Sequence, residues 1–357
     1  MKTGGFPERD WRRRGPRILF LAAALPLLAT ITRPVPQPPA GAGNAMLSAS
    51  AIPFDGGDRA RRRAGSLLFL AGWTLASGDW RFGGISGMHV GRGEVVAISD
   101  TGMLLRFPLP GARTSLPVRF DPLVEGPGPR ARKANRDTEA LLVRGGRIWA
   151  AFERHNMIWR YDSGSLRAES AARPEAMRRW RGNRGSEALV RLGDGRFLVF
   201  AEGRDDGAMF SDVVLFSGDP SVPGTPAARL RYRRPAGFRA TDAALLPDGR
   251  ILILNRRFRL LEGWSARLVL AEVGGGGTIE GREIAALEAP LAVDNMEALS
   301  VTVEDGRTIV WIASDDNFSP LQRTLLLKFE LTAEPSPRRR DTPQSTTLRG
   351  PRRPGSR

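Results

Sequence analysis

Five polar residues recur at nearly equal intervals along the middle of the chain, each inside a short apolar stretch. They are Ser86, Glu139, Glu187, Asp242 and Glu297, and successive members lie 53, 48, 55 and 55 residues apart. Carboxylates that are held close together raise one another's pKa and are costly without a counter-charge. A hard cation supplies that charge, and Ca²⁺ prefers six to eight oxygen ligands. If the repeat brings these positions together, the sequence predicts a Ca²⁺ site whose ligands are Glu139, Glu187, Asp242 and Glu297.

A structural role is the alternative for each single acid. The body of the chain is rich in arginine, so an acid near the start of a strand can pair with an arginine of a neighbouring repeat or cap its own strand. Convergence of the acids on one coordination sphere would favour the metal site. Separate pairs with arginines would favour the structural role.

A second polar set follows the next apolar run of each repeat, where four or five apolar residues end in charge. The set comprises Asp100, Glu153-Arg154-His155, Glu202-Gly-Arg204-Asp205, Asn255-Arg256-Arg257 and Asp315-Asp-Asn317. Arginine forks match phosphate oxygens, and a bound metal polarises a phosphoryl oxygen and activates water. We therefore predict Asp100, Asp315 and His155 as catalytic residues. We predict that Arg154, Arg204 and Arg256 bind a small anionic ester substrate, together with Lys133 before the second repeat.

Composition and spacing argue against several other chemistries. The chain has no cysteine and only two histidines, which excludes disulfides, thiolate metal sites and histidine-rich metal clusters. It contains no G-x-S-x-G sequence, the spacing of a serine nucleophile elbow. On a strand, His89 would point to the opposite face from Ser86. A serine triad is therefore not expected, and His89 is interpreted as structural.

The repeat also predicts the elements that must position these residues. Each of five segments consists of an apolar stretch with the polar residue, a glycine-containing turn and a strongly apolar run. Two further apolar runs follow in most units, which gives four candidate strands per unit. A period of about 40–50 residues with several strands per unit is typical of a β-propeller. We predict an all-β propeller with five blades, or six if residues 101–135 contain a degenerate blade.

The two ends of this domain are expected to meet. The last unit has only three apolar runs and ends near residue 331, whereas an apolar run at 66–75 has no unit of its own. Pairing the two would complete the fourth strand of the last blade and would protect edges that are otherwise open. The sequence therefore predicts a ring closed by pairing an N-terminal with a C-terminal strand.

The net charge of +16 is concentrated outside this domain. Residues 1–65 carry +7, residues 333–357 carry +5, and the remainder carries only +4. A nucleic-acid partner, which would require clustered basic residues on the folded body, is therefore not expected. We divide the chain into 1–50, a signal peptide or N-terminal membrane anchor with a Pro-rich linker, 66–331, the propeller, and 333–357, a disordered basic tail.

The N-terminal segment has the pattern of an export signal. Four arginines between Arg12 and Arg17 precede the apolar run 18–31, and small residues follow near 40–51. A basic start, an apolar stretch of about 7–15 residues and a small-residue exit are typical of such signals. Ala40-Gly-Ala42 and Ala49-Ser-Ala51 both fit a cleavage site, and an uncleaved anchor in the inner membrane is the alternative. A periplasmic or exported location is predicted.

Five motifs together resemble a bacterial exported family. They are Gly84-Ile-Ser-Gly-Met with Ile98-Ser-Asp-Thr-Gly102, Asp137-Thr-Glu-Ala-Leu141, Asn183-Arg-Gly-Ser-Glu-Ala-Leu189, Asp294-Asn-Met-Glu-Ala-Leu299 and Ser314-Asp-Asp-Asn-Phe318. The family is known as the esterase-like activity of phytase family, or phytase-like propellers. The resemblance covers roughly residues 66–331. It implies a β-propeller in the bacterial envelope and a phosphoester or ester hydrolase activity.

The chain resembles the calcium-dependent phytase propellers more remotely. In those propellers the acids at the channel mouth build the metal cluster. The resemblance implies that role for Glu139, Glu187, Glu297, Asp100 and Asp315. Asp242 departs from the glutamate of the other later repeats, and no dense Lys/Arg pocket for phytate is evident.

The sequence thus predicts a monomeric, exported, Ca²⁺-binding hydrolase of phosphate or carboxylic esters with peripheral or N-terminal membrane association. Two alternatives remain from other classes. One is a non-catalytic envelope propeller that binds a ligand or a protein through the same channel mouth. The other is a Ca²⁺-dependent lactonase.

Overall fold

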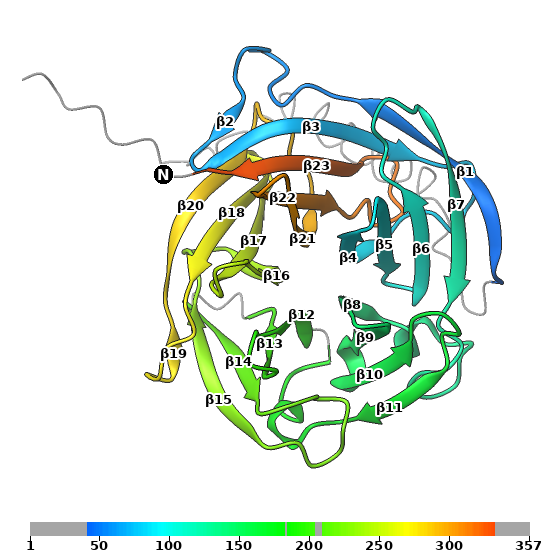
Figure 1. The fold of residues 1–357 in the computed structure, drawn as a ribbon, viewed down its shortest axis with the longest axis vertical. Helices are drawn as coiled ribbons and strands as arrows, with labels where there is room; N and C mark the ends of the chain where they lie inside the picture. Colours follow the sequence, from blue (N-terminus) through cyan, green and yellow to red (C-terminus); the bar gives the residue numbers. More distant parts are fainter. Residues whose placement is uncertain (1–40, 183, 204–208, 333–357) are drawn as a thin grey trace, which may run out of the picture.

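The computed structural model of the chain describes residues 41–182, 184–203 and 209–332, which are almost entirely β-structure arranged around a central axis (Figure 1). Five four-stranded groups make up this ring. The first is β4 (Ile85–Gly91), β5 (Glu94–Ser99), β6 (Met103–Pro108) and β7 (Ser115–Pro122); the second is β8 (Thr138–Arg144), β9 (Arg147–Phe152), β10 (Met157–Asp162) and β11 (Ala168–Ala172). The third is β12 (Ser186–Arg191), β13 (Phe197–Ala201), β14 (Phe210–Phe216) and β15 (Ala227–Arg233).

The remaining two groups complete the ring. The fourth is β16 (Arg239–Leu245), β17 (Ile251–Arg259), β18 (Gly263–Ala271) and β20 (Gly281–Glu288), and the fifth is β21 (Met296–Glu304), β22 (Arg307–Ser314), β23 (Thr324–Leu331) and β3 (Leu67–Ala76). Three strands lie outside these groups: β1 (Gly43–Ala51), β2 (Arg63–Ala64) and β19 (Thr278–Ile279). Short 3₁₀ turns lie at Lys133–Asn135, Glu153–His155 and Glu175–Met177.

The first strand of each group faces the axis. We call β4, β8, β12, β16 and β21 the inner strands, and each packs against the next around the ring, with β21 returning to β4. Antiparallel strands follow outward from each inner strand. They are consecutive along the chain except for β20, which follows β19, and for β3, which joins the fifth group from the start of the domain. This is the arrangement of a β-propeller, so the predicted fold class is confirmed.

The ring closes where the sequence predicted. β23 pairs with β3 in antiparallel register, from Thr324 opposite Leu75 to Leu331 opposite Leu67. The C-terminal strand therefore lies between its own hairpin partner β22 and a strand from the start of the domain. The three rings of Phe54, Phe69 and Phe329 meet at this closure, with centroids 5.0–5.7 Å apart.

β1 was expected to be linker and is part of the sheet instead. It lies between β3 and β7, with Ser48 opposite both Ala76 and Ser115, and so joins the outer strands of the last and first groups. Leu47 and Ala49 alternate inward and are buried, whereas their neighbours are exposed. The sheet of the described residues therefore includes Gly43–Ala51, N-terminal to residue 66.

The core lies between the blades. The second strands are buried on both faces and are accordingly continuous apolar runs, such as Phe197-Leu-Val-Phe-Ala201. Large rings, including Phe200, Tyr232 and Trp311, fill the space between neighbouring sheets. This packing fixes the inner strands as a rigid frame for the side chains at their ends.

The apolar run 18–31 and the tail 333–357 lie outside the described residues. Within the described part of the chain, no helix is both long and apolar enough to span a bilayer.

Candidate functional site

Each inner strand carries an irregularity near its start. Pairing with the second strand skips one residue in every blade, and the skipped residues are Ser86, Glu139, Glu187, Thr241 and Glu297. A β-bulge of this kind leaves one residue unpaired and re-aims its side chain. Four of the five repeated positions, all except Asp242, are therefore bulge residues, at the end of the channel where the inner strands begin. We call this the acidic end of the channel.

Asp242 is offset by one residue from the three glutamates. The bulge residue of the fourth blade is Thr241, and Asp242 is paired normally opposite Leu254. The carboxylate of Asp242 is buried and accepts hydrogen bonds from the backbone N–H groups of Leu299 at 2.7 Å and Ala243 at 2.8 Å. Its predicted equivalence with Glu187 and Glu297 is therefore corrected: it fastens two neighbouring inner strands.

The two bulges without an acid carry hydroxyl groups that hold the ring together. Ser86 Oγ donates to the carbonyl of Thr138 at 2.6 Å, and Thr241 Oγ1 donates to the carbonyl of Met296 at 3.2 Å. Each acceptor directly precedes a glutamate of the next blade. The hydroxyls thereby position the backbone from which Glu139 and Glu297 project.

Three carboxylates form a compact group at this end. Asp137 and Glu139 lie at the start of β8, and Glu153 follows β9; one oxygen of each lies within 4.8 Å of the others. Gly185 N–H donates to Glu153 Oε1 at 3.1 Å and fixes that side chain. Three hard oxygen ligands at this spacing suit a divalent cation such as Ca²⁺.

Glu139 and Glu187 have no counter-charge bound to them. Burial, followed by repulsion from Glu187 and Glu297, holds the pKa of Glu139 well above its usual range. Burial, followed by repulsion from Glu202 and Glu153, does the same to the pKa of Glu187, which is 4 % exposed. Among the described residues, neither carboxylate takes part in a hydrogen bond or ion pair. The charge of Arg256 opposes the rise in the pKa of Glu187 without reversing it.

Asp100 and Asp315 lie close to Glu297. Burial and then repulsion from Glu297 and Asp100 raise the pKa of Asp315. Burial also raises the pKa of Asp100, although the ammonium of Lys133 at 2.6 Å opposes it. Asp100 Oδ1 is buried and has no hydrogen-bond partner within the described residues. The structure thus brings both predicted catalytic aspartates to the acidic end.

The predicted cations lie among these acids and are already paired. Lys133 pairs with Asp100, and Arg154 Nε lies 2.6 Å from Asp137 Oδ2. Arg256 lies 3.0 Å from Glu297, contacts Asn295 Oδ1 and stacks over Trp264, with 5.6 Å to the ring centroid. Arg204 falls outside the described residues.

His155 lies to one side. Its Nε2 makes a 2.9 Å hydrogen bond with Asn135 Oδ1. Burial, then the positive charges of Arg173 and Arg136, lower its pKa. Within the described part of the chain, its side chain makes no hydrogen bond or ion pair with a carboxylate of the acidic end.

Three residues of the site had no role predicted from sequence: Glu153, Asp137 and Asn295. Burial, followed by repulsion from Asp137 and Glu202, raises the pKa of Glu153 to about 7. Asn295 Nδ2 donates to Glu297 Oε1 at 2.7 Å, and Asn295 Oδ1 accepts from Arg256. The available signal was position: Glu153 ends its strand as Asp100 and Asp315 end theirs, and Asp137 and Asn295 each precede a bulge glutamate by two residues.

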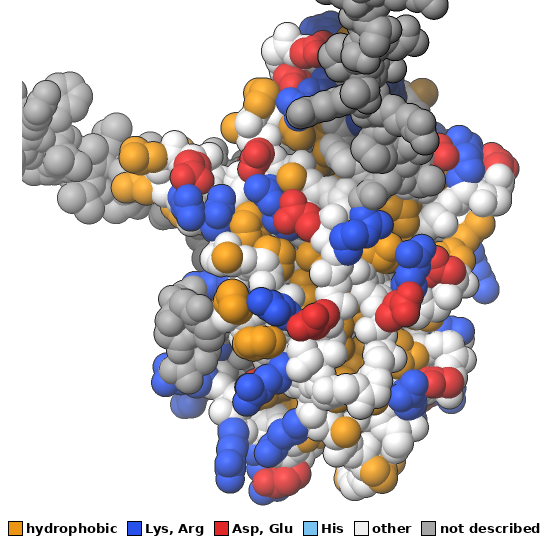
Figure 2. All heavy atoms as spheres, turned by 90° about the vertical axis from the view of Figure 1, so that its left-hand side faces the viewer, with side chains coloured by type: hydrophobic (Ala, Val, Ile, Leu, Met, Phe, Trp, Pro, Cys, Tyr) orange, Lys and Arg blue, Asp and Glu red, His pale blue; other side chains and the backbone are white. Residues whose placement is uncertain are grey.

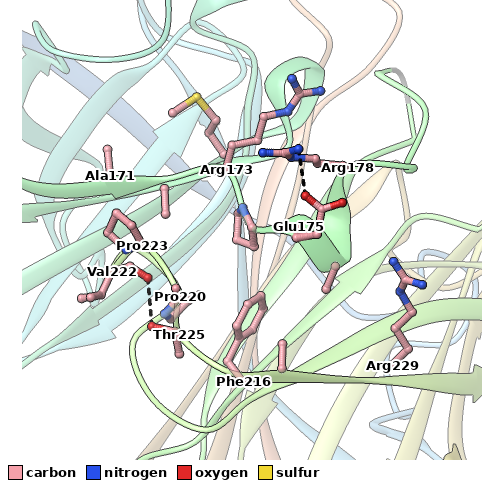
Figure 3. A pocket seen from close by; sticks show the side chains of 16 residues that line it. Ala171, Arg173, Glu175, Arg178, Phe216, Pro220, Val222, Pro223, Thr225 and Arg229 are labelled. Carbon is pink, nitrogen blue, oxygen red and sulfur yellow. Dashed lines mark hydrogen bonds and ion pairs between the residues drawn. The ribbon is translucent and has the colours of Figure 1, made fainter.

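A separate groove lies away from the acidic end. A groove of about 750 Å³ lies between the outer parts of the second and third blades, with Phe216, Val222 and Pro223 on its walls and Arg173, Arg178 and Arg229 around it (Figure 3). Arg178 is paired with Glu175 at 2.8 Å. None of the carboxylates of the acidic end lines this groove. The groove is therefore distinct from the acidic end of the channel.

Comparison with known proteins places the chain in a family. A family model described as Phytase-like, esterase-like activity of phytase, matches residues 80–318, which include every bulge residue of the acidic end. No curated protein matches the chain significantly.

Several solved structures have a similar overall shape. Glutaminyl cyclase of Myxococcus xanthus is 12 % identical, with a TM-score of 0.42, over 70 % of this chain and 92 % of its own. The PQQ-bound aldose sugar dehydrogenase of Streptomyces coelicolor is 13 % identical, with a TM-score of 0.42, over 76 % and 99 %. The calcium-binding protein regucalcin of Agrobacterium tumefaciens is 12 % identical, with a TM-score of 0.36, over 70 % and 92 %. These similarities concern shape and not activity.

Proposed function

The chain belongs to the phytase-like family, whose description is esterase-like activity of phytase, and we propose that it is a metal-dependent hydrolase of phosphate or carboxylic esters. One observation carries the proposal: Glu139 and Glu187 are carboxylates without a donor among the described residues, beside the compact group of Asp137, Glu139 and Glu153. Buried carboxylates without partners are costly, and a divalent cation compensates them.

The residues present fit Ca²⁺ by their chemistry. Asp137, Glu139 and Glu153 supply three carboxylate oxygens within one small sphere, and Glu187 adds a fourth acid, whose pKa the charge of Glu153 raises. All are hard ligands, and the chain has no thiolate to offer a softer metal. Bound there, the cation would polarise a substrate oxygen and lower the pKa of a bound water.

The side chains around this group can handle an anionic substrate. The guanidinium of Arg154 is half exposed above Asp137, so its remaining N–H groups can donate to a phosphate or carboxylate at the mouth. Lys133 is partly exposed beside Asp100 and can do the same. Glu153 Oε1 is held by Gly185 N–H, which leaves Oε2 to accept or release a proton near neutral pH.

A non-catalytic binding propeller is the second candidate, and specific contacts favour it. Asp100 is paired with Lys133, Glu297 with Arg256, and Glu202 with Arg239 at 2.7 Å. Those pairs neutralise three acids of the site without a metal. The two candidate functions differ in the role of the unpaired acids Glu139 and Glu187: they serve either a reaction or only the binding of a ligand.

We also propose an exported, periplasmic monomer, with peripheral or N-terminal membrane association and no nucleic-acid partner. The basic and apolar N-terminal pattern of the sequence supports export. The weak net charge of the propeller itself supports the absence of a nucleic-acid surface.

The test is hydrolysis of p-nitrophenyl phosphate and p-nitrophenyl butyrate by the full chain, after chelation and after addition of Ca²⁺. We expect activity on at least one ester that chelation removes and Ca²⁺ restores, together with a rise in melting temperature on Ca²⁺ addition. Glu187→Gln should lose both effects. A melting shift without hydrolysis would support the binding propeller, and the absence of both would exclude the metal site.

A further inference from the structure

The hairpin between β17 and β18 ends in an exposed apolar tip. Leu260 is 88 % exposed and Leu261 is 98 % exposed, and Phe258 beside them is 53 % exposed. Apolar side chains scattered singly over a surface are ordinary, but two adjacent leucines without cover at the end of a projecting hairpin are not. They indicate a binding surface that a partner covers.

The hairpin is a firm support for this tip. β17 and β18 remain paired as far as Phe258 opposite Trp264 and Arg259 opposite Gly263. The rings of Phe258 and Trp264 are in contact, with centroids 4.9 Å apart, and Arg259 pairs with Glu262 at 2.9 Å across the turn. The leucines therefore cannot fold back onto the ring without breaking these contacts.

The tip projects from the side of the ring that carries the acidic end. Arg256, on the same strand, contacts Glu297 there. Leu260 lies four residues further along an extended strand, so it stands on the order of 13 Å beyond Arg256. The tip thus projects past the mouth and does not close it.

Other exposed apolar side chains share this side. Trp80, Val124, Met209 and Leu321 are 54 %, 57 %, 43 % and 68 % exposed, in loops that lead into inner strands or leave second strands, as the hairpin does. Figure 2 views the molecule from the left-hand side of Figure 1 and shows hydrophobic side chains (orange) beside basic ones (blue) on a projection at its left edge. The apolar side chains come from several blades and so present a broad face.

Two of the loops on this side, 123–137 and 173–185, carry an excess of basic residues. Between Arg173 and Gly185, the chain has five arginines and one acid. Between Leu123 and Asp137 it has three arginines, of which Arg136 is buried, one lysine and two acids. Arg257 and Arg259 add two more at the hairpin, against Glu262. Anionic lipid headgroups attract such clusters.

We propose that this face docks onto an anionic lipid bilayer, with Leu260 and Leu261 inserted at the boundary between headgroups and acyl chains. A bilayer yields around a convex apolar tip and can bury it anywhere on its surface, without a preformed pocket. The spread of apolar side chains over several loops, interspersed with arginine, fits an extended anionic surface. This adds residues and an orientation to the membrane association proposed above, and it does not depend on hydrolysis.

The test uses a fluorescent label in the full chain. Because the chain has no cysteine, Leu261→Cys provides a single thiol for an environment-sensitive NBD label. On vesicles of phosphatidylcholine with phosphatidylglycerol, we expect its emission to rise about twofold or more and shift to the blue, and spin-labelled lipid to quench it. Phosphatidylcholine vesicles alone should give a smaller response.

A matched label controls for other contacts with lipid. Val303→Cys places the thiol on a residue that is 58 % exposed at the opposite end of an inner strand, and its emission should not change. The N-terminal apolar run alone could hold both variants on vesicles, but it would not distinguish the two positions. A silent label at 261, equal responses at 261 and 303, equal responses to neutral and anionic vesicles, or a response to protein concentration without lipid would each overturn the proposal.

Discussion

The two ends of the channel are built by the same five strands and differ in kind. At the acidic end each inner strand bulges and projects Glu139, Glu187, Glu297 or a hydroxyl toward its neighbours. At the other end, which we call the apolar end, a cavity of about 260 Å³ is lined largely by apolar residues such as Leu142, Val190 and Val301. In the pairing of the five inner strands with their second strands, as far as the structure describes them, the bulges lie only at the acidic end, where the regular alternation of the pleat is interrupted.

The difference shows how a symmetric repeat becomes a site. Regular pairing gives each side chain a fixed direction and favours packing, as at the apolar end. A bulge in the same place in each blade turns one side chain per blade out of that pattern. Chemistry is therefore expected where the strands are irregular, and the following experiments separate the two ends.

The largest expected effect is on pH dependence at the acidic end. In the metal-free folded protein the pKa of Glu153 is about 7, against an ordinary value of 4.5. Its stabilising contribution is complete below pH 4.5 and is lost as the pH rises through 7, because the folded state then has to release its extra proton. Glu153 alone should lower the free energy of unfolding by about 3 kcal/mol between those limits.

Urea denaturation in chelator at pH 4.5, 6 and 8 measures this loss. Glu153→Gln is the matched control, since it keeps both histidines, whose lowered pKa values act in the opposite direction. As the pH rises, the unfolding free energy of the original chain should fall relative to that of the Glu153→Gln variant. A difference that is constant with pH would contradict the assignment.

The next effect contrasts two acids on inner strands. Glu187→Gln should weaken Ca²⁺ binding about 100-fold or more, because it removes one of the two unpaired acids of the site. It should not lower the melting temperature of the chelated protein, because the lost charge was repelled by its neighbours. Calorimetric titration with Ca²⁺ measures the first effect, and thermal melting in chelator measures the second.

Asp242→Asn is the informative comparison for Glu187→Gln. Its carboxylate is held by two backbone N–H groups, so the substitution should destabilise the fold and leave Ca²⁺ affinity within a few-fold of the original. If both variants lost Ca²⁺ to the same extent, Asp242 would belong to the metal site as its spacing in the sequence suggested.

The smallest effect is expected at the apolar end. Val190 is buried at the channel cavity, and Val190→Ala removes two methyl groups from packing. A loss of about 1–2 kcal/mol in unfolding free energy is expected, with Ca²⁺ affinity and ester hydrolysis unchanged. A change in Ca²⁺ affinity would show that the two ends are coupled.

The fold was largely predictable because it repeats. Each of the five segments contains an acid or hydroxyl, a turn and an apolar run, so the repeat can be recognised in the sequence. The apolar run at 66–75 had no unit of its own, and the last unit lacked a fourth strand, so their pairing could be predicted. β1 was not predictable: Gly43–Ala51 contains only two residues, Met46 and Leu47, with large apolar side chains, and its burial depends on strands far along the chain.

The site was predictable in its composition and not in its geometry. Thr241 and Asp242 are both polar, and a sequence does not say which of the two occupies the bulge. The pairing of Arg256 with Glu297 and of Lys133 with Asp100 joins residues about 40 and 33 positions apart, in different blades or in the loops between them. The raised pKa of Glu153 arises from burial and from the charges of other blades, neither of which is visible locally.

The closing pair of strands also sets an order of events during synthesis. Leu331 meets Leu67 only after the last strand has left the ribosome, so the ring has to wait for more than 250 residues of chain. Until then the ring is open and Glu297 is not fixed beside Glu139 and Glu187, so the full set of carboxylates is not yet assembled; only Asp137, Glu139 and Glu153 lie within one hairpin. If the chain crosses a translocation pore before the ring closes, its carboxylates come together only on the far side of the membrane. The cations that would neutralise them would then be bound in that same compartment.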